Sequence, residues 1–279
     1  MTTKPHLIAI DLDGTLLNGE KNISERSKAA IHEARKQGHH VAIATGRPFR
    51  ASARYYDELS LDSPMINFNG AFVHHPLDRS FGTYHTPLDL KTAHSIVTSC
   101  NEIKVKNIMA EVIDDVYLHE HDDQIVQNMI MKESSIITGE ILKNLNHDPT
   151  SLLILPHDEQ LKELRDTLHK HHAETIEHRV WAAPWNIIEI VKIGLNKAVG
   201  LRRLAEHFNV PQERVIAFGD EDNDLEMIEY AGTGVAMGNA IEPLKNIANE
   251  ITVSNDEDGI AVYLEERLNL SVQRTGQLS

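Results

Sequence analysis

The loop Asp11-Leu12-Asp13-Gly14-Thr15 follows directly on an apolar run at residues 6–10, and it constrains the fold more than any other segment. A short run that is apolar throughout predicts a strand buried on both faces. Two carboxylates at the end of such a strand repel each other, and each one resists burial. A bound divalent cation removes both penalties and leaves one carboxylate to act as a nucleophile and the other as an acid and base. The loop therefore predicts a metal-dependent site for phosphoryl transfer through an aspartyl-phosphate.

Both terminal thirds of the chain alternate such apolar runs with helical segments. A helix is expected between Ser24, as its N-cap, and Gly38, as its stop signal. The other expected strands lie at residues 41–44, 65–68, 215–218, 234–237 and 251–253, and further helices at 198–208 and 225–231. Apolar strands separated by helices predict an α/β fold, a Rossmann-like doubly wound parallel sheet with helices on both faces.

The middle third has a different pattern. Segments 108–113 and 116–119 flank Asp114-Asp115 and predict an antiparallel hairpin. Helices are expected at 88–100, 122–132 and 158–171, and strands at 151–155, 173–180 and 187–191. We therefore expect residues 85–190 to form an α+β cap inserted into a core made of residues 1–84 and 191–279.

Composition limits the partners. The chain has 279 residues and a formal net charge of −15, so a nucleic-acid partner is not expected. One cysteine, Cys100, excludes an internal disulfide framework and fits a reducing compartment. No run approaches the roughly 20 apolar residues of a membrane span, and the first apolar stretch is too short for a signal peptide. A cytoplasmic protein with a small phosphorylated metabolite as its partner, and no membrane, is expected.

The residues that carry chemistry follow the predicted parallel strands. Thr45-Gly46-Arg47 follows the second strand, Asn69-Gly70 the third, and Gly219-Asp220-Glu221-Asp222-Asn223-Asp224 the strand at 215–218, while Lys197 opens a helix. Ligands of open parallel sheets bind at the carboxyl ends of the strands, so these loops are expected to converge on one crevice.

These motifs resemble those of the haloacid dehalogenase-like phosphatases, in particular the Cof-type group with a large α/β cap. The likeness covers nearly the whole chain. Four pieces match the motifs of the group in order: 11–15, 45–47, Lys197 and 219–224; the pieces Asn69-Gly70, 236–240 and 258–261 also look like it. The resemblance implies a Mg²⁺-dependent phosphomonoesterase that acts on small phosphorylated metabolites.

Each matched position then has an expected role. Asp11 is the nucleophile and a Mg²⁺ ligand, Asp13 is the acid and base and binds the metal through its carbonyl, and Asp220 is the third metal ligand. Phosphate would be bound by the N–H groups of Leu12 and Gly46 and by the side chains of Thr45, Lys197 and Asn223.

The remaining candidates support the site or read the leaving group: Arg47, Asn69, Asp224, Trp185 and Asn186. Arg47 either braces loops or touches substrate. Asp224 either orients metal-bound water or only caps the next helix. Trp185 and Asn186 lie on the return path from the cap.

Three functions fit these motifs to different degrees. A phosphatase is favoured. A phosphotransferase or mutase would use the same aspartyl-phosphate. A calcium-binding protein fits worse, because the loop that starts at Asp220 has Leu225 and Ala231 where an EF-hand needs glycine and glutamate. Members of the resembled group act on sugar phosphates, pyridoxal phosphate, FMN and the phosphoribitylamino-pyrimidine of riboflavin synthesis. The last, 5-amino-6-(5-phospho-D-ribitylamino)uracil, is the candidate substrate.

Overall fold

The computed structural model describes residues 4–130, 136–181 and 186–270, and it divides them into two compact units. The first unit holds residues up to Gly46, Ala53–Thr83 and the chain from Asn196 onward. The second holds Arg47–Ser52 and Tyr84–Leu195. Arg47–Ser52 therefore belongs to the second unit, whereas the sequence places this segment in the core.

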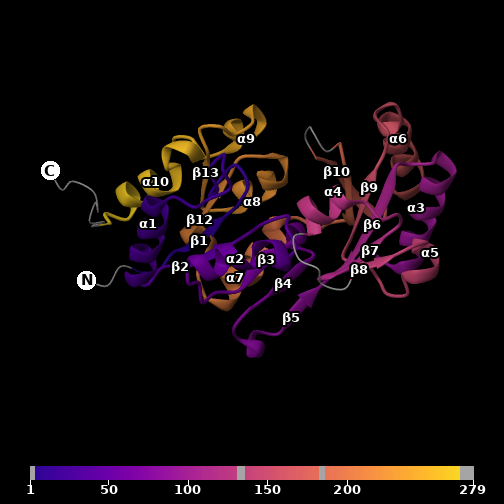
Figure 1. The fold of residues 1–279 in the computed structure, drawn as a ribbon. Helices are drawn as coiled ribbons and strands as arrows, with labels where there is room; N and C mark the ends of the chain where they lie inside the picture. The colour runs from indigo at the N-terminus through magenta and orange to yellow at the C-terminus, as the bar shows by residue number, and fades with distance from the viewer. Residues whose placement is uncertain (1–3, 131–135, 182–185, 271–279) are drawn as a thin grey trace. The chain divides into compact units, whose positions relative to one another are not determined.

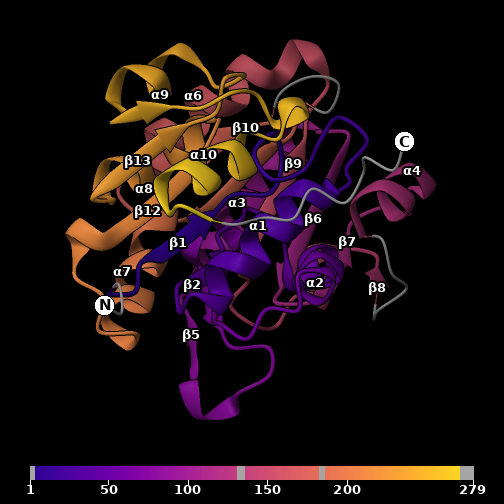
Figure 2. The same cartoon turned by 90° about the vertical axis from the view of Figure 1, so that its left-hand side faces the viewer.

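A parallel sheet forms the centre of the first unit. Its strands lie in the order β14 (Glu250–Ile251), β13 (Thr233–Ala236), β12 (Val215–Gly219), β1 (Leu7–Ile10) and β2 (His40–Ile43). Figure 2 shows β13, β12, β1 and β2 side by side in this order. Every pair among them is parallel. The central strands are apolar throughout because both faces of the sheet are covered.

Helices cover both faces of this sheet (Figure 1). On one side α1 (Glu25–Lys36) packs against α10 (Gly259–Arg267), and a bidentate Arg26–Glu265 pair joins them. On the other side α7 (Lys197–His207) packs against α8 (Leu225–Tyr230). The expected doubly wound α/β architecture is confirmed.

Local signals set the ends of α1 as expected. Ser24 is the N-cap, and its side chain accepts a hydrogen bond from the N–H of Ser27 at 3.1 Å. Gly38 follows the helix at φ 91°, a left-handed conformation that glycine adopts without strain.

Further elements extend the first unit beyond β2. A parallel bridge from Ala44 to Ile66 sets β3 (Met65–Asn67) beside β2. The other elements of the first unit are β4 (Phe72–His74), the antiparallel partner of β3, and α9 (Glu242–Ile247). The chain passes from one unit to the other within α2 (Phe49–Glu58), at residues 52 and 53, and within β5 (Thr83–His85), at residues 83 and 84. Short 3₁₀ turns lie at Phe68–Gly70, Arg79–Phe81, Gln212–Arg214, Asp222–Asp224 and Asn255–Glu257.

The second unit is an α+β fold, as expected. Its sheet has the order β10 (Ile176–Val180), β11 (Ile188–Lys192), β9 (Ser151–Leu155), β6 (Asn107–Val112), β7 (Asp115–Leu118) and β8 (Ile136–Thr138). The hairpin of β6 and β7 is the predicted one. One face carries an apolar core with α3 (Leu90–Ile103), α5 (Ile141–Asn144) and α6 (Leu161–His172), the last of which follows a 3₁₀ turn at Asp158–Gln160.

The helix expected at 122–132 is wrong in form. The structure has a single turn, α4 (Asp123–Ile125), followed by a π-helical segment at Val126–Ile130. Asp122 caps this turn through the N–H groups of Gln124 and Ile125, so the predicted start is confirmed.

Candidate active site

Three buried carboxylates meet at the carboxyl ends of β1 and β12. Asp11 follows β1, and Asp220 and Asp224 lie in the loop after β12. One carboxylate oxygen from each lies within 4.8 Å of the others, and Asp11, Asp220 and Asp224 are 5%, 6% and 0% exposed. β1 and β12 are neighbours in the sheet, which explains why loops so far apart in sequence converge.

Lys197 neutralises part of this cluster. It is the first residue of α7 and is fully buried. Its Nζ donates to Asp11 Oδ1 at 2.6 Å and to Asp224 Oδ1 at 2.7 Å. Asn196 precedes it as the N-cap of α7 and accepts from the N–H of Val199 at 3.2 Å, so helix capping fixes where Lys197 starts.

The charges of the cluster do not balance. Burial raises the pKa of Asp11, and the carboxylates of Asp224 and Asp220 add to this effect while Lys197 opposes it. Burial also raises the pKa of Asp220 to about 7. For Lys197, burial lowers the pKa, but the carboxylates of Asp11 and Asp224 outweigh burial and raise it overall. A further positive charge beside Asp11 and Asp220 would favour the ionised form of both carboxyl groups.

Gly14 and Thr15 bring Asp220 against the first loop. Gly14 has φ 77°, and a Cβ at this position would lie 2.1 Å from Asp220 Oδ2. The hydroxyl of Thr15 donates to Asp220 Oδ1 at 2.6 Å. The close approach needs both the left-handed backbone and the missing side chain of glycine. The contact from Thr15 was not predicted, although the residue lies within the first motif.

Asp13 is the most exposed of the candidate carboxylates. Its side chain is 41% exposed, and Asp13 Oδ1 accepts from Lys21 Nζ at 2.8 Å. A parallel bridge joins Asp13 to Leu17, and Lys21 lies four residues after Leu17 with φ 61°. Nothing in the sequence pattern singled out Lys21.

The loop after β2 lies beside the loop after β3. Thr45 is buried, and its N–H donates to Ile66 O at 2.9 Å. Gly46 faces the side chain of Asn69, which would lie 3.2 Å from a Cβ at position 46. Asn69 Oδ1 accepts from Asn223 Nδ2 at 3.1 Å, so three predicted residues are brought together. Leu12 is buried, and its carbonyl accepts from the N–H of Leu17 at 2.8 Å.

Asp224 holds the loop after β12 in shape. Asp224 Oδ2 accepts from the N–H of Asp220 at 3.0 Å and of Glu221 at 3.3 Å, while Oδ1 binds Lys197. Its side chain makes no cap hydrogen bond to α8. This helix begins at Leu225, the sixth position of the loop, so the loop does not wrap round an ion as an EF-hand loop does.

Two asparagines that the sequence analysis did not single out brace the first loop. Asn239 Nδ2 donates to Gly14 O at 2.8 Å, and Asn239 Oδ1 accepts from the N–H of Asn255 at 3.0 Å. Asn255 Nδ2 donates to Leu17 O at 2.8 Å. Asn239 lies in a segment that matched the resembled group, which was the one signal available for it.

The other candidates lie in the second unit. Arg47 donates from its guanidinium to Ala51 O at 3.2 Å. Asn186 has φ 45° and donates to Asp158 Oδ1 at 3.1 Å. Trp185 lies outside the described residues. Trp181, four residues earlier in the chain, donates from Nε1 to the buried Glu189 at 3.1 Å.

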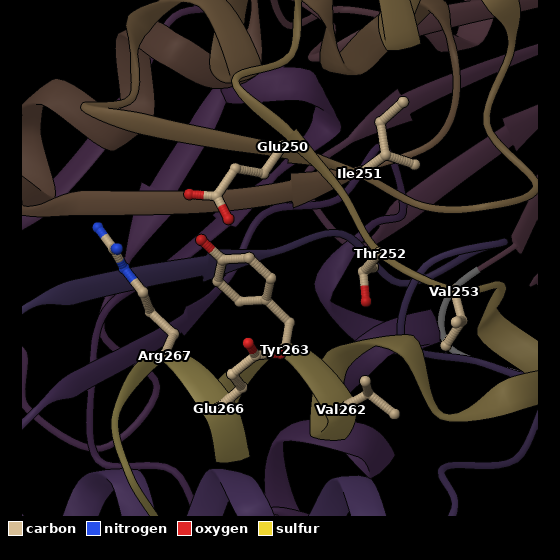
Figure 3. Close-up of a pocket in the computed structure, with 8 residues that line it drawn as sticks. All are labelled: Glu250, Ile251, Thr252, Val253, Val262, Tyr263, Glu266 and Arg267. Carbon is tan, nitrogen blue, oxygen red and sulfur yellow. The ribbon is translucent and has the colours of Figure 1, made fainter.

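A separate hollow of about 560 Å³ lies against β14 and α10 (Figure 3). Its lining includes Glu250, Tyr263 and Arg267, and burial raises the pKa of the Tyr263 phenol to about 12. None of the predicted site residues lines it. Among the described residues, no helix has the length and apolar character needed to cross a membrane.

The chain is similar to known proteins over nearly its whole length. A family model of haloacid dehalogenase-like hydrolases matches residues 8–264. The 5-amino-6-(5-phospho-D-ribitylamino)uracil phosphatase YitU of Bacillus subtilis (strain 168) is 51% identical over 270 residues, which cover 97% of this chain and 100% of that protein. The phosphatase YcsE of the same strain, with the same named substrate, is 34% identical over 91% of this chain and 92% of its own length.

A solved structure extends the likeness to the fold. The crystal structure of a haloacid dehalogenase-like hydrolase from Bacteroides thetaiotaomicron matches with a TM-score of 0.81 at 29% identity, over 95% of this chain and 100% of that one.

Proposed function

Since the chain belongs to the haloacid dehalogenase-like hydrolase family and is a phosphatase, we propose that its substrate is 5-amino-6-(5-phospho-D-ribitylamino)uracil. The 51% identity to YitU over nearly both whole chains supports this choice. The same substrate is named for YcsE. Sugar phosphates, pyridoxal phosphate and FMN are the alternatives that the assay below includes.

One observation carries the catalytic assignment. Lys197, Asp11, Asp220 and Asp224 form a single buried network at the carboxyl ends of two neighbouring strands. A carboxylate that is buried beside a fixed cation is aligned as a nucleophile, and the ammonium group also offsets the charge of an incoming phosphate.

The proposed reaction has two steps. An Asp11 carboxylate oxygen attacks phosphorus and displaces the alcohol of the substrate, to which protonated Asp13 gives its proton. Asp13, now a carboxylate, then takes a proton from water as the water oxygen attacks the phosphorus of the aspartyl-phosphate. Phosphate leaves and Asp11 is restored. Asp13 is suited to this role because its carboxylate is the most exposed of the candidates and lies within reach of solvent.

Lys197 and the loops around Gly46 would bind the phosphate. Thr45 supplies a hydroxyl, Gly46 and Leu12 supply N–H groups, and Asn223 supplies an amide. Gly46 suits this role because it has no side chain to stand between its N–H and the phosphate.

The residues fit Mg²⁺. Hard oxygen donors are what this ion binds, and we propose the carboxylates of Asp11 and Asp220 with the carbonyl of Asp13 as its protein ligands. Asp224 is not chosen, because both of its oxygens already accept hydrogen bonds. When bound, Mg²⁺ would neutralise charge on the transferring phosphoryl group.

The cap is proposed to read the leaving group. The catalytic loops bind phosphate, so discrimination between substrates must come from elsewhere. In the second unit, the buried carboxylate of Glu189 holds the indole ring of Trp181 through a hydrogen bond, and an aromatic ring suits a ring-bearing leaving group. Trp185 and Asn186 remain proposals for the same role. We also propose residues 85–190 as the limits of the cap, and a cytoplasmic location for the protein.

An assay of phosphate release tests the substrate. The purified protein with Mg²⁺ is given 5-amino-6-(5-phospho-D-ribitylamino)uracil and, in parallel, sugar phosphates, pyridoxal phosphate and FMN. We expect the highest kcat/KM for the first compound. A higher value for any of the others would replace the proposed substrate, and transfer of phosphate to a second sugar would indicate a phosphotransferase.

Metal removal tests the proposed ligands. We expect no turnover after exhaustive chelation, full recovery with Mg²⁺ and inhibition by Ca²⁺, which prefers more ligands at longer distances. Calorimetry should show Mg²⁺ binding to the wild type and to Asp222→Asn, whose side chain is exposed in the same loop, and weak binding to Asp220→Asn. Undiminished turnover in the chelated protein would contradict the metal assignment.

A further inference from the structure

The turn after β3 has an unusual backbone. Three successive residues, Phe68, Asn69 and Gly70, have φ values of 49°, 51° and 97°. Residues other than glycine rarely adopt this left-handed backbone conformation, and a large aromatic residue adopts it least readily. All three residues are buried. Such strain persists where the surrounding structure imposes it, and it concentrates at functional sites.

This turn touches the loop after β2 on one side. The N–H of Asn69 donates to Thr45 O at 3.2 Å. The side chain of Asn69 lies over Gly46, where a Cβ would come within 3.2 Å of both its amide nitrogen and its oxygen. Thr45 and Gly46 are therefore held by the backbone and the side chain of the same residue.

On its other side the turn touches two further catalytic segments. Asn69 Oδ1 accepts from Asn223 Nδ2 at 3.1 Å, across 154 residues of sequence. Gly70 lies against the carbonyl of Asn196, which a Cβ would approach to 2.3 Å. Asn196 is the N-cap of the helix that begins with Lys197. One three-residue turn thus contacts the segments that carry Thr45, Asn223 and Lys197.

We propose that Asn69 is a positioning residue, which holds Thr45-Gly46 and Asn223 at the spacing that a phosphoryl group requires. The proposal rests on the proposed function, because it concerns the phosphate-binding groups of that site. Asn69 acts through its neighbours: its oxygen orients the amide of Asn223, and its side chain fixes the backbone of Gly46.

The chemistry explains why asparagine suits this position. Asparagine tolerates the left-handed region better than other residues with a side chain, and its oxygen accepts a hydrogen bond without adding negative charge near a phosphate. Glycine would satisfy the backbone but would lose the acceptor. This difference separates a structural role from a positioning role.

The Asn69→Gly variant exploits that difference. Because glycine adopts φ 51° without strain, we expect the melting temperature to stay close to that of the wild type, while kcat falls about 10- to 100-fold through misplaced phosphate-binding groups. Asn209→Gly is the matched control: Asn209 has φ 52° and is exposed at the end of α7. Its kcat should be unchanged. A wild-type kcat for Asn69→Gly would overturn the proposal.

A double-mutant cycle with Asn223→Ala identifies the partner. If Asn69 acts through Asn223, Asn69→Gly should reduce kcat far less in the Asn223→Ala background than in the wild type. In each background the change in KM should be smaller than the change in kcat. If the two substitutions reduce kcat by independent factors, so that the double variant shows their product, the inference is overturned.

The same cycle on the affinity for inorganic phosphate, measured by calorimetry, separates this inference from the proposed function. If the wild type shows no turnover, the proposed function fails, but the affinity for phosphate still tests the role of Asn69. Coupling between the effects of the two substitutions on this affinity supports the inference. Independent losses of affinity, or no phosphate binding at all, overturn it.

Discussion

Asp11 and Lys197 are 186 residues apart in the sequence, yet Asp11 Oδ1 and Lys197 Nζ lie 2.6 Å apart in a buried environment. A buried ion pair of this kind contributes little net stability, because desolvation of both charges offsets their attraction. Its effect is to fix one carboxylate oxygen of Asp11, the proposed nucleophile. Since Lys197 also binds Asp224, the position of the Asp11 carboxylate depends on two loops and a helix N-terminus at once.

The nucleophile assignment predicts the outcome of Asp11→Asn. The amide has nearly the same shape, so the fold should survive, but it cannot form the acyl-phosphate. We expect turnover to fall by several orders of magnitude, as it does when a member of a catalytic unit is lost. Phosphate release and the melting temperature are measured on the same preparation, with Asp222→Asn as the exposed control. Activity above about 1% of wild type, in protein free of deamidated product, contradicts covalent catalysis by Asp11.

Gly14 predicts a second effect at this scale. Gly14→Ala places a Cβ 2.1 Å from Asp220 Oδ2, so either Asp220 or the first loop must shift and their close contact is lost. We expect kcat to fall about 100-fold, because small displacements of catalytic groups have effects of this size. Gly38→Ala is the control. Gly38 has φ 91° and no atom within 4 Å of its Cβ position, so this variant has the backbone strain of Gly14→Ala without its steric clash. Equal kcat values for the two variants would show that Gly14 does not position Asp220.

Much of the site could be predicted from its residues, because short motifs directly after strands gather at one sheet edge. Asp11, Asp220 and Lys197 are expected there, and the structure places them in one buried network. Asn223 is expected there too, and it donates a hydrogen bond to Asn69. Their catalytic roles remain predictions. Thr15, Lys21 and Asn239 could not be found this way, since their contacts depend on how loops fold back and leave no periodic pattern.

At the scale of elements, helix caps have unequal consequences. Ser24 caps α1 and Asn196 caps α7, each through one hydrogen bond from its side chain to the first turn. Removing either cap should lower stability by about 1 kcal/mol. Only α7 carries a candidate catalytic group in its first turn, Lys197.

Asn196→Ala and Ser24→Ala should therefore differ in activity. We expect similar drops in melting temperature, but a several-fold lower kcat for Asn196→Ala alone, since fraying at the start of α7 frees Lys197. Thermal unfolding and steady-state kinetics on both variants check this. Matching kcat values would indicate that the carboxylates hold Lys197 without help from the cap.

The elements that the sequence predicts well are the buried parallel strands and the capped helix α1, because hydrophobic burial and capping are local signals. The segment at 122–132 shows the limit: its apolar spacing resembles a helix, but the structure forms one α-turn and then a π-helical segment. The left-handed turn at Phe68 was also beyond prediction, since tertiary contacts with Gly46 and Asn196 impose it.

For the whole molecule, partly buried histidines make stability depend on pH. Burial lowers the pKa of His6 and of His74 to about 4, and burial also lowers the pKa of His39 and His40. Between pH 6.5 and 4 the unfolded chain then binds more protons than the folded one, so this stabilisation is present above the unfolded pKa of about 6.5 and is lost as the pH falls. Asp220, with its raised pKa, acts in the opposite direction.

A variant separates the two contributions. His74→Gln removes one histidine that resists protonation and leaves the carboxylates in place. We expect the difference in melting temperature between wild type and His74→Gln to shift in favour of the variant as the pH falls from about 7.5 to about 5. His32→Gln, which changes an exposed residue of α1, is the control. A difference that stays constant over this range contradicts the role assigned to His74.

The grouping of Arg47–Ser52 with the second unit matters for recombining domains between relatives. Arg50 forms a buried ion pair with Glu111, donates to Ile113 O at 3.3 Å, and its N–H donates to Asp114 at 3.1 Å. A graft that exchanged residues 84–195 alone would replace the partner of Arg50. A buried charge left without its partner strongly destabilises the fold. The transferable module is therefore discontinuous: it must carry the first turn of α2 along with the cap, and a hybrid built so should keep its ion pair whichever relative donates the rest.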